Sequence, residues 1–169
     1  MKLKPIYVLG DKAFITLTKG LFTEIDKCDL PKVGGYNWCA TKSSKTFYAV
    51  RRTSNNKKSI WMHREIVGAN KCNDVDHKNN NGLYNVRSNL RECTHRQNTY
   101  NQQKSKNKSS TYKGVYFKKS AKKFAVMIAI DTKRTHIGYF NDEVSAAKAY
   151  DKAAIKYQGE FARLNFPQS

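Results

Sequence analysis

A segment without any apolar side chain interrupts this chain of 169 residues and limits how it can fold. Residues 102–111 have the sequence QQKSKNKSST, a composition typical of a solvated, flexible linker. Both flanks keep aliphatic and aromatic residues, so we expect folded structure on each side. The sequence therefore predicts a β-rich N-terminal region over 1–60, a central motif over 61–101 and a C-terminal domain over 112–167.

The composition favours a polyanionic partner. The chain has 32 Lys and Arg against 13 Asp and Glu, which gives a formal net charge of +19. Hydrophobic residues make up 39% and aromatic residues 12%, more than a disordered basic tail would keep. No apolar run is long enough to span a membrane, and the first ten residues lack the apolar core of a signal peptide. We expect an intracellular protein that binds nucleic acid and no membrane.

The charge is concentrated at the two ends of the chain. Basic residues outnumber acidic ones by 12 to 4 in residues 1–60 and by 14 to 5 in residues 102–169. In residues 61–101 the ratio is only 6 to 4. Between Glu92 and Asp131 there is no acidic residue, whereas nine basic ones occur. A nearly neutral centre in a basic protein suggests that its carboxylates have a function.

Turn signals divide the N-terminal region into short strands. Ala13, Ile15 and Leu17 alternate with polar residues up to Gly20, which predicts a strand. Three further segments rich in β-formers lie between polar turns and predict a small antiparallel meander. These segments are residues 36–40, Thr46–Arg52 and 59–63.

The C-terminal third has a β-β-β-α pattern. The predicted strands cover residues 112–117, 124–130 and 135–140, and a helix follows over 142–157. Asn141 is the expected N-cap of this helix, and Gly159 ends it. The residues expected on its apolar face are Val144, Ala147, Tyr150, Ala154 and Tyr157.

The central segment concentrates Asp, Asn, His and Arg side chains. A carboxylate and an amide oxygen suit Mg²⁺ or Mn²⁺, and a neutral His can take a proton from water near pH 7. Phosphodiester hydrolysis needs such a set. Segments rich in Asp and Asn also form turns and helix caps, however, and composition leaves both interpretations open.

A family resemblance adds to this interpretation. The motifs MHREIVG and VDHKNNNGLYNVRSNLRECTHRQN, between Met62 and Asn98, resemble HNH homing endonucleases of phages and mobile elements. The resemblance implies a ββα-metal core with His77 as general base and Asn89 orienting it or the loop. It implies one Mg²⁺ or Mn²⁺ ion held by Asp76 and Asn98. We expect His63 to be structural and His95 to contact phosphate or solvent.

The C-terminal third resembles a second family. The motifs YKGV (112–115), IGYF (137–140), AYD (149–151) and LNFP (164–167) look like the Apetala/ERF-type DNA-binding domain. The resemblance implies a three-stranded antiparallel sheet packed on one helix, with the sheet in the DNA major groove. Because Met127 and Ala129 offer no base-edge hydrogen bond, they would meet a thymine methyl group. The expected DNA-contacting residues are Lys113, Tyr116, Lys118, Met127, Ala129, Arg134 and His136, with Lys119, Lys122 and Lys123 on phosphates.

The sequence thus predicts an α+β protein that acts as an HNH endonuclease. It would nick one strand of double-stranded DNA as a monomer, with a divalent metal and no small-molecule cofactor. The expected location is the cytoplasm of a bacterial or phage-infected cell. Two alternatives stay open: a non-enzymatic DNA-binding regulator with a relic HNH motif, and a basic RNA-binding protein. For the last, the sequence shows no aromatic platform for single strands. The Lys-rich run 118–123 could also be an ordinary solvated loop.

Overall fold

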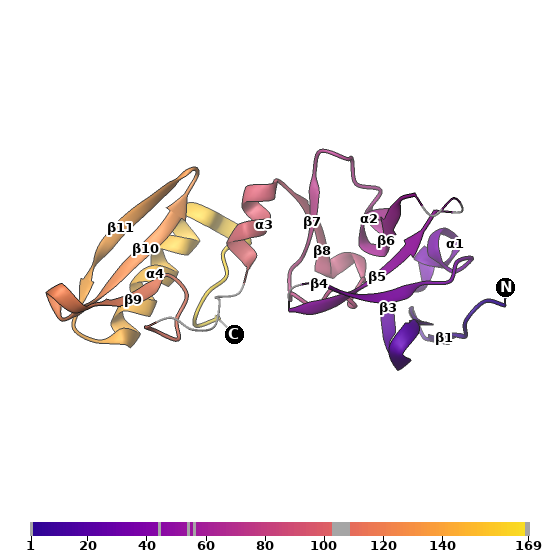
Figure 1. Cartoon of the computed structure of the whole chain (residues 1–169), viewed down its shortest axis with the longest axis horizontal. Coiled ribbons are helices and arrows are strands. Elements are labelled where there is room, and N and C mark those ends of the chain that lie inside the picture. Colours follow the sequence, from indigo (N-terminus) through magenta and orange to yellow (C-terminus); the bar gives the residue numbers. More distant parts are fainter. Residues whose placement is uncertain (1, 44, 54, 56, 103–108, 168–169) are drawn as a thin grey trace. The chain divides into compact units, whose positions relative to one another are not determined.

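The computed structural model describes residues 2–43, 45–53, 55, 57–102 and 109–167 (Figure 1). They form two compact units, Met1–His95 and Arg96–Ser169. Residues 103–108 of the predicted linker lie outside the described residues. The α+β class is confirmed, since the described parts hold helices and four antiparallel sheets. None of the helices in these parts has the length and apolar character needed to cross a membrane.

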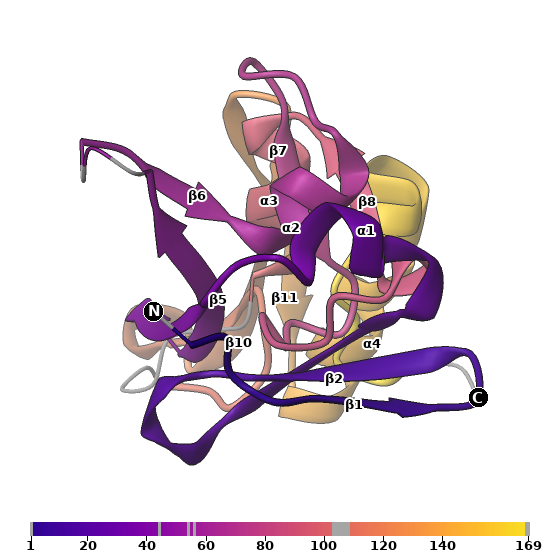
Figure 2. The same ribbon diagram turned by 90° about the vertical axis from the view of Figure 1, so that its right-hand side faces the viewer.

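The first unit contains three small sheets and two short helices (Figure 2). The predicted alternation of Ala13 and Ile15 is confirmed, because both side chains are buried on one face of their strand. The sheets are β1 (Ile6–Leu9), β2 (Lys12–Thr16) and β3 (Phe22–Asp26); β4 (Cys39–Ser43), β5 (Thr46–Arg52) and β6 (Ser59–Trp61); and β7 (Asp74–His77) with β8 (Leu90–Cys93). The helices are α1 (Leu30–Val33) and α2 (Met62–Val67).

The core of the first unit forms around Trp38. Its ring is fully buried, and its Nε1 donates a hydrogen bond to the Val33 carbonyl over 2.8 Å. Met62 and Ile66 of α2 are equally buried. The predicted strand 59–63 is therefore wrong at its end, because the chain turns into α2 at Met62 and buries one face of that helix.

The second unit packs one sheet on one helix. Its strands are β9 (Val115–Lys118), β10 (Lys123–Ile130) and β11 (Lys133–Phe140), with β10 in the centre. The predicted β-β-β-α succession, with an antiparallel sheet and one helix, is confirmed by these strands and by α4 (Glu143–Gln158). Small residues such as Ala147 and Ala154 are fully buried between α4 and the sheet, which allows close approach.

Helix α3 (His95–Asn101) begins at the boundary between the two units. The remaining helical turns are η1 (Thr18–Gly20), η2 (Lys27–Asp29), η3 (Arg87–Asn89), η4 (Lys119–Ala121) and η5 (Gly159–Phe161).

Two details of α4 differ from the prediction. The N-cap is Asp142 instead of Asn141, since the Asp142 Oδ1 accepts a hydrogen bond from the Ser145 N–H over 2.7 Å. Val144 and Tyr157 do not belong to the buried face, because they are 43% and 46% exposed. The buried face runs from Ala146 to Gln158 and is built largely from alanines.

A chain of hydrogen bonds ties the C-terminal segment to α4 and to the sheet. The buried Asp151 carboxylate accepts hydrogen bonds from the backbone N–H groups of Asn165 and Phe166, over 2.8 and 2.9 Å. The Asn165 side chain then pairs with both backbone groups of Lys113, over 2.6 and 3.2 Å. The segment before β9 is thereby fixed next to Gly114, which lies against the Tyr150 ring of α4.

Candidate nucleic-acid interface

The pairing register of β9–β11 separates the sheet into two faces. Val126 opposes Val115 and Gly138, and this face packs on α4. On the other face Met127 opposes His136, and Ala129 opposes Arg134. Because side chains alternate along a strand, the register assigns one set to what we call the outer face. The outer face consists of Tyr116, Lys118, Lys123, Ala125, Met127, Ala129, Arg134, His136 and Tyr139.

A bulge in β11 adds a residue that sequence reasoning missed. Strict alternation from Arg134 and His136 would direct Tyr139 toward α4. The register shifts between Val126 and Met127, so that Ile137 is an extra residue between the paired positions Gly138 and His136. Ile137 packs in the core, and Tyr139 is 43% exposed. The sequence signal is the spacing of the apolar residues Ile137 and Phe140, which lie three residues apart and both pack against the core.

Tyr139 organises the polar groups around it. The Lys118 ammonium donates a hydrogen bond to the Tyr139 hydroxyl over 2.7 Å, and this bond raises the pKa of Lys118 above its usual value. The His136 and Tyr139 rings lie 4.6 Å apart. Lys118 thus stays cationic beside the Tyr139 ring, which itself contacts the His136 ring, an arrangement that suits phosphate and base contacts.

Most of the predicted contact residues share this exposed, acid-poor surface. Lys118, Lys123, Ala129, Arg134 and His136 are exposed, whereas Tyr116 and Met127 are half-buried. Lys119 and Lys122 are exposed in the turn between β9 and β10. The structure thereby brings together most of the residues that the sequence proposed for DNA contact.

Lys113 lies apart from the outer-face residues. Its ammonium donates a hydrogen bond to the Tyr100 carbonyl at the end of α3. Burial of the side chain, and the nearby Arg163 to a smaller extent, lower the pKa of Lys113 to about 8. This lysine therefore connects α3 to the sheet of the second unit.

The predicted catalytic cluster is held in internal contacts of the first unit. The Asp76 Oδ2 accepts hydrogen bonds from the Arg91 Nε and Nη2, over 3.0 and 2.7 Å, and both side chains are largely buried. His77 is 5% exposed, and its Nε2 is 2.9 Å from the Oδ1 of the fully buried Asn85. Burial lowers the pKa of His77, and it lowers that of the neighbouring His63 to about 3.

The asparagines of this segment bond to loop backbone. Asn89 donates to the Tyr84 carbonyl over 2.7 Å and accepts from the Asn79 N–H over 3.1 Å. The Asn79 and Asn81 side chains each accept from a backbone N–H two residues further on. This is the turn-forming behaviour that composition left open. Asn98, the other predicted metal ligand, lies on α3 in the second unit. His95, expected to contact phosphate or solvent, has its Nδ1 3.0 Å from the Asp74 Oδ2.

In the first unit the Asp76 carboxylate is the ion-pair partner of Arg91. The Asp76 oxygen that faces Arg91 is already engaged by two N–H donors, and a cation would compete with the guanidinium. No group of three or more His, Cys, Asp or Glu in the described residues is arranged to hold a metal ion. The Mg²⁺ or Mn²⁺ ion expected from the sequence stays a prediction.

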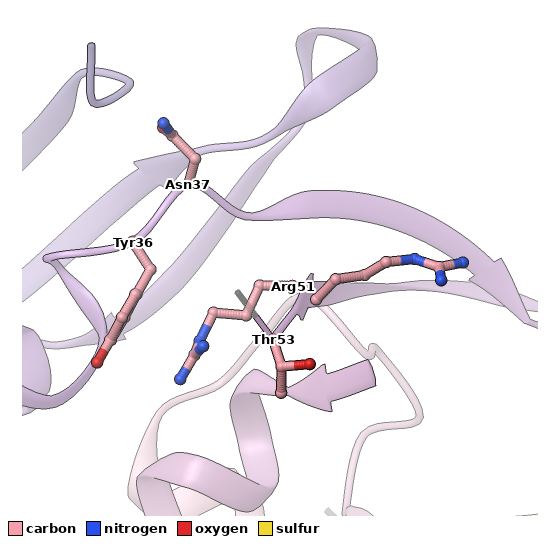
Figure 3. A pocket seen from close by; sticks show the side chains of 5 residues that line it. Tyr36, Asn37, Arg51 and Thr53 are labelled. Atoms are coloured by element: carbon pink, nitrogen blue, oxygen red, sulfur yellow. The ribbon is translucent and has the colours of Figure 1, made fainter. Parts of the chain in front are cut away.

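A pocket of about 440 Å³ lies elsewhere on the first unit (Figure 3). Arg51 dominates it: the guanidinium lies 3.8 Å from the centre of the Tyr36 ring and donates to the Glu65 carboxylate over 2.9 Å. Its charge is therefore already compensated. The pocket is lined by Tyr36, Asn37, Arg51, Arg52 and Thr53.

Comparison with known proteins supports the C-terminal resemblance. A segment of 61 residues is 38% identical to the AP2-like ethylene-responsive transcription factor TOE2 of Arabidopsis thaliana, and covers 36% of this chain and 13% of that protein. A segment of 59 residues is 42% identical to an AP2/ERF and B3 domain-containing protein of Oryza sativa subsp. japonica. This segment covers 35% of this chain and 16% of that protein. A third relative, the APETALA2-like protein 2 of Oryza sativa subsp. indica, is 38% identical over 61 residues. That segment covers 36% of this chain and 14% of the length of the relative.

These matches cover a small part of each relative. The chain spans only 13 to 16% of the length of these relatives. No protein-family model matches the chain, and no solved structure matches it. The comparisons therefore support an ERF-type DNA-binding domain in this chain, and they give no support to the HNH part.

The predicted endonuclease is corrected by these findings. The first relative is named as an AP2-like transcription factor, the second for its AP2/ERF domain and the third as an APETALA2-like protein. None of these three relatives is named as a nuclease. The physical reason is visible in the first unit, where Arg91 holds Asp76 and Asn85 holds His77. The expectations of a hydrolase and of a phage or mobile-element origin fall with it. The alternative of a DNA-binding regulator agrees better with the comparisons.

Proposed function

We propose that this chain is a non-enzymatic DNA-binding regulator whose second unit binds double-stranded DNA through the outer face of β9–β11. The observation that carries the proposal is the placement of Lys118, Arg134 and His136 on one exposed sheet face. The resemblance to AP2/ERF-named proteins supports the same partner. We expect one chain per DNA site, which stays a prediction.

The residues of the outer face divide into two roles. Lys118 and Lys123 lie opposite each other near the turn and would neutralise phosphates. Arg134 and His136 lie on β11 next to Ala129 and Met127, which leave room for the edges of bases. Because Met127 and Ala129 can only contact thymine methyl groups, base selection would depend on the β11 side chains.

A matched pair of variants tests the proposal. Arg134→Ala removes a basic side chain from the outer face, whereas Lys133→Ala removes one whose strand partner, Ile130, packs toward the core. Binding of a fluorescent duplex should weaken about tenfold for Arg134→Ala, the cost of one base or phosphate contact. The slope of log K against log salt should fall by about 0.9 if that contact is to phosphate.

The control variant decides the outcome. Lys133→Ala should change duplex affinity less than about twofold, because an exposed charge outside the interface contributes little. Equal losses in the two variants would mean non-specific charge attraction and would contradict the proposed face. Tighter binding of single-stranded RNA than of duplex DNA would favour the RNA-binding alternative instead.

A further inference from the structure

The side of α4 that faces away from the sheet carries a regular row of lysines. Lys148, Lys152 and Lys156 are spaced by four residues, so they follow one ridge of the helix. All three are exposed, whereas Ala147, Tyr150 and Ala154 point into the core. We call this surface the lysine ridge.

Two of the three charges of the lysine ridge have no ion-pair partner among the described residues. In the part of the chain that the structure describes, neither Lys148 nor Lys152 takes part in a salt bridge. Asp151 lies next to Lys152 in sequence, but its carboxylate is buried and accepts hydrogen bonds from Asn165 and Phe166. Like charges four residues apart destabilise a helix, so the ridge costs folding free energy unless a partner neutralises it.

Apolar side chains flank the lysines. Val144 is one turn before Lys148 and is 43% exposed, and Ile155 lies three residues after Lys152 and is 49% exposed. Tyr157 is 46% exposed at the end of the helix. A phosphate backbone offers charge but no apolar surface for these side chains. A protein segment that alternates carboxylates with apolar residues offers both.

We propose that the lysine ridge, with Val144 and Ile155, binds an acidic, apolar-containing segment of a partner protein. The ridge and the outer face of the sheet lie on opposite sides of the second unit, because α4 covers the inner face of β9–β11 (Figure 1). The same unit therefore binds the protein segment while its sheet remains available. This inference goes beyond the proposed DNA binding and does not depend on it.

Peptide probes test the charge and the apolar contributions separately. The first probe is a labelled synthetic peptide that alternates Glu with Leu and Phe, and the second replaces every Leu and Phe by Ser. At low salt the full-length chain should bind the first probe at least about fivefold more tightly than the second, because Val144 and Ile155 become covered. The variant Lys148→Glu/Lys152→Glu/Lys156→Glu should bind the first probe about tenfold or more weakly.

A charge-matched control separates the ridge from general attraction. Lys27→Glu/Lys57→Glu/Lys71→Glu makes the same change in net charge at exposed positions of the first unit. It should retain the peptide affinity within about twofold, and Ile155→Ser should lose most of the preference for the apolar probe. A far-UV circular dichroism spectrum checks that each variant is folded.

Three results would overturn the proposal. Equal peptide affinity of the ridge variant and the control variant would show that net charge alone attracts the probe. A larger loss of duplex binding than of peptide binding in the ridge variant would make the ridge a nucleic-acid surface. Equal affinity for the two probes would remove the apolar contribution. DNA binding by the wild-type chain is measured separately, so failure of the proposed function would be distinguishable.

Discussion

Replacing Gly114 by alanine should destabilise the second unit strongly, although it adds only one methyl group. Gly114 has a φ of +76°, a conformation that L-residues adopt at a cost of about 1–2 kcal/mol. A Cβ atom there would lie 2.0 Å from Cδ2 and 2.2 Å from Cε2 of Tyr150. It would also lie 2.9 Å from the Met127 carbonyl oxygen.

The steric overlap adds to the backbone strain. Tyr150 is 2% exposed and packs between α4 and the sheet, so its ring has little space to move. Overpacking of this kind costs about 1–3 kcal/mol. Together the two effects predict a loss of about 2–5 kcal/mol in the free energy of unfolding, a large share of the ~5–15 kcal/mol typical of a domain.

Hydrogen exchange measured by mass spectrometry can assign the loss to one unit. Peptides from β10 and α4 should exchange faster in Gly114→Ala, whereas peptides from β2 should not change. Gly68→Ala in the first unit is the control for the backbone cost, because Gly68 has a φ of +74° in the left-handed region but nothing within 4 Å of the place that an added Cβ atom would take. It should lose only about 1 kcal/mol, read from peptides of the first unit. A loss in Gly114→Ala no larger than in Gly68→Ala would refute the steric argument.

Three further predictions concern buried polar groups. The pKa of His63 is about 3 in the folded chain, below the usual 6.5. The stability that neutral His63 contributes is therefore fully present above about pH 6.5 and is lost as the pH falls toward 3. By pH 4.5 the loss should be about 3 kcal/mol in urea titrations followed by tryptophan fluorescence, with a flatter profile for His63→Phe. Arg91→Met should cost about 3–5 kcal/mol because it leaves the buried Asp76 carboxylate without its partner, and Asp76→Leu/Arg91→Met should recover part of the loss in the same titration. Asp151→Ala should lower the free energy of unfolding of the second unit by about 2–4 kcal/mol, measured by hydrogen exchange, because it leaves the N–H groups of Asn165 and Phe166 unpaired. Lys152→Ala should change this free energy by no more than about 0.5 kcal/mol.

The C-terminal fold follows closely from local patterns in the sequence. The helix predicted over 142–157 corresponds to α4, because its cap, alanine-rich face and terminal Gly159 all act over short distances. The outer face of the sheet was less predictable. The bulge at Ile137 reverses the alternation of β11, and it depends on packing against α4 rather than on local sequence.

Side-chain partners distant in sequence explain the remaining differences. Lys113 is of a residue type that suits phosphate binding, but its ammonium donates a hydrogen bond to the Tyr100 carbonyl. Asp76 and His77 have residue types that suit a metal and a base, but Arg91 and Asn85 occupy their polar atoms. No local pattern reveals such pairings, because they form only when segments that are separate in sequence pack together, as β7 and β8 do around Asp76 and Arg91.

A nuclear magnetic resonance titration with duplex DNA tests the central claim most directly. The amide signals of the full chain are followed while a mixed-sequence duplex is added at low salt. We predict that the largest shift changes occur at Tyr116, Lys118, Arg134, His136 and Tyr139, and that α4 changes little. Changes concentrated in the first unit or on α4, with the strands β9–β11 unaffected, would contradict the claim that this sheet is the DNA-binding face.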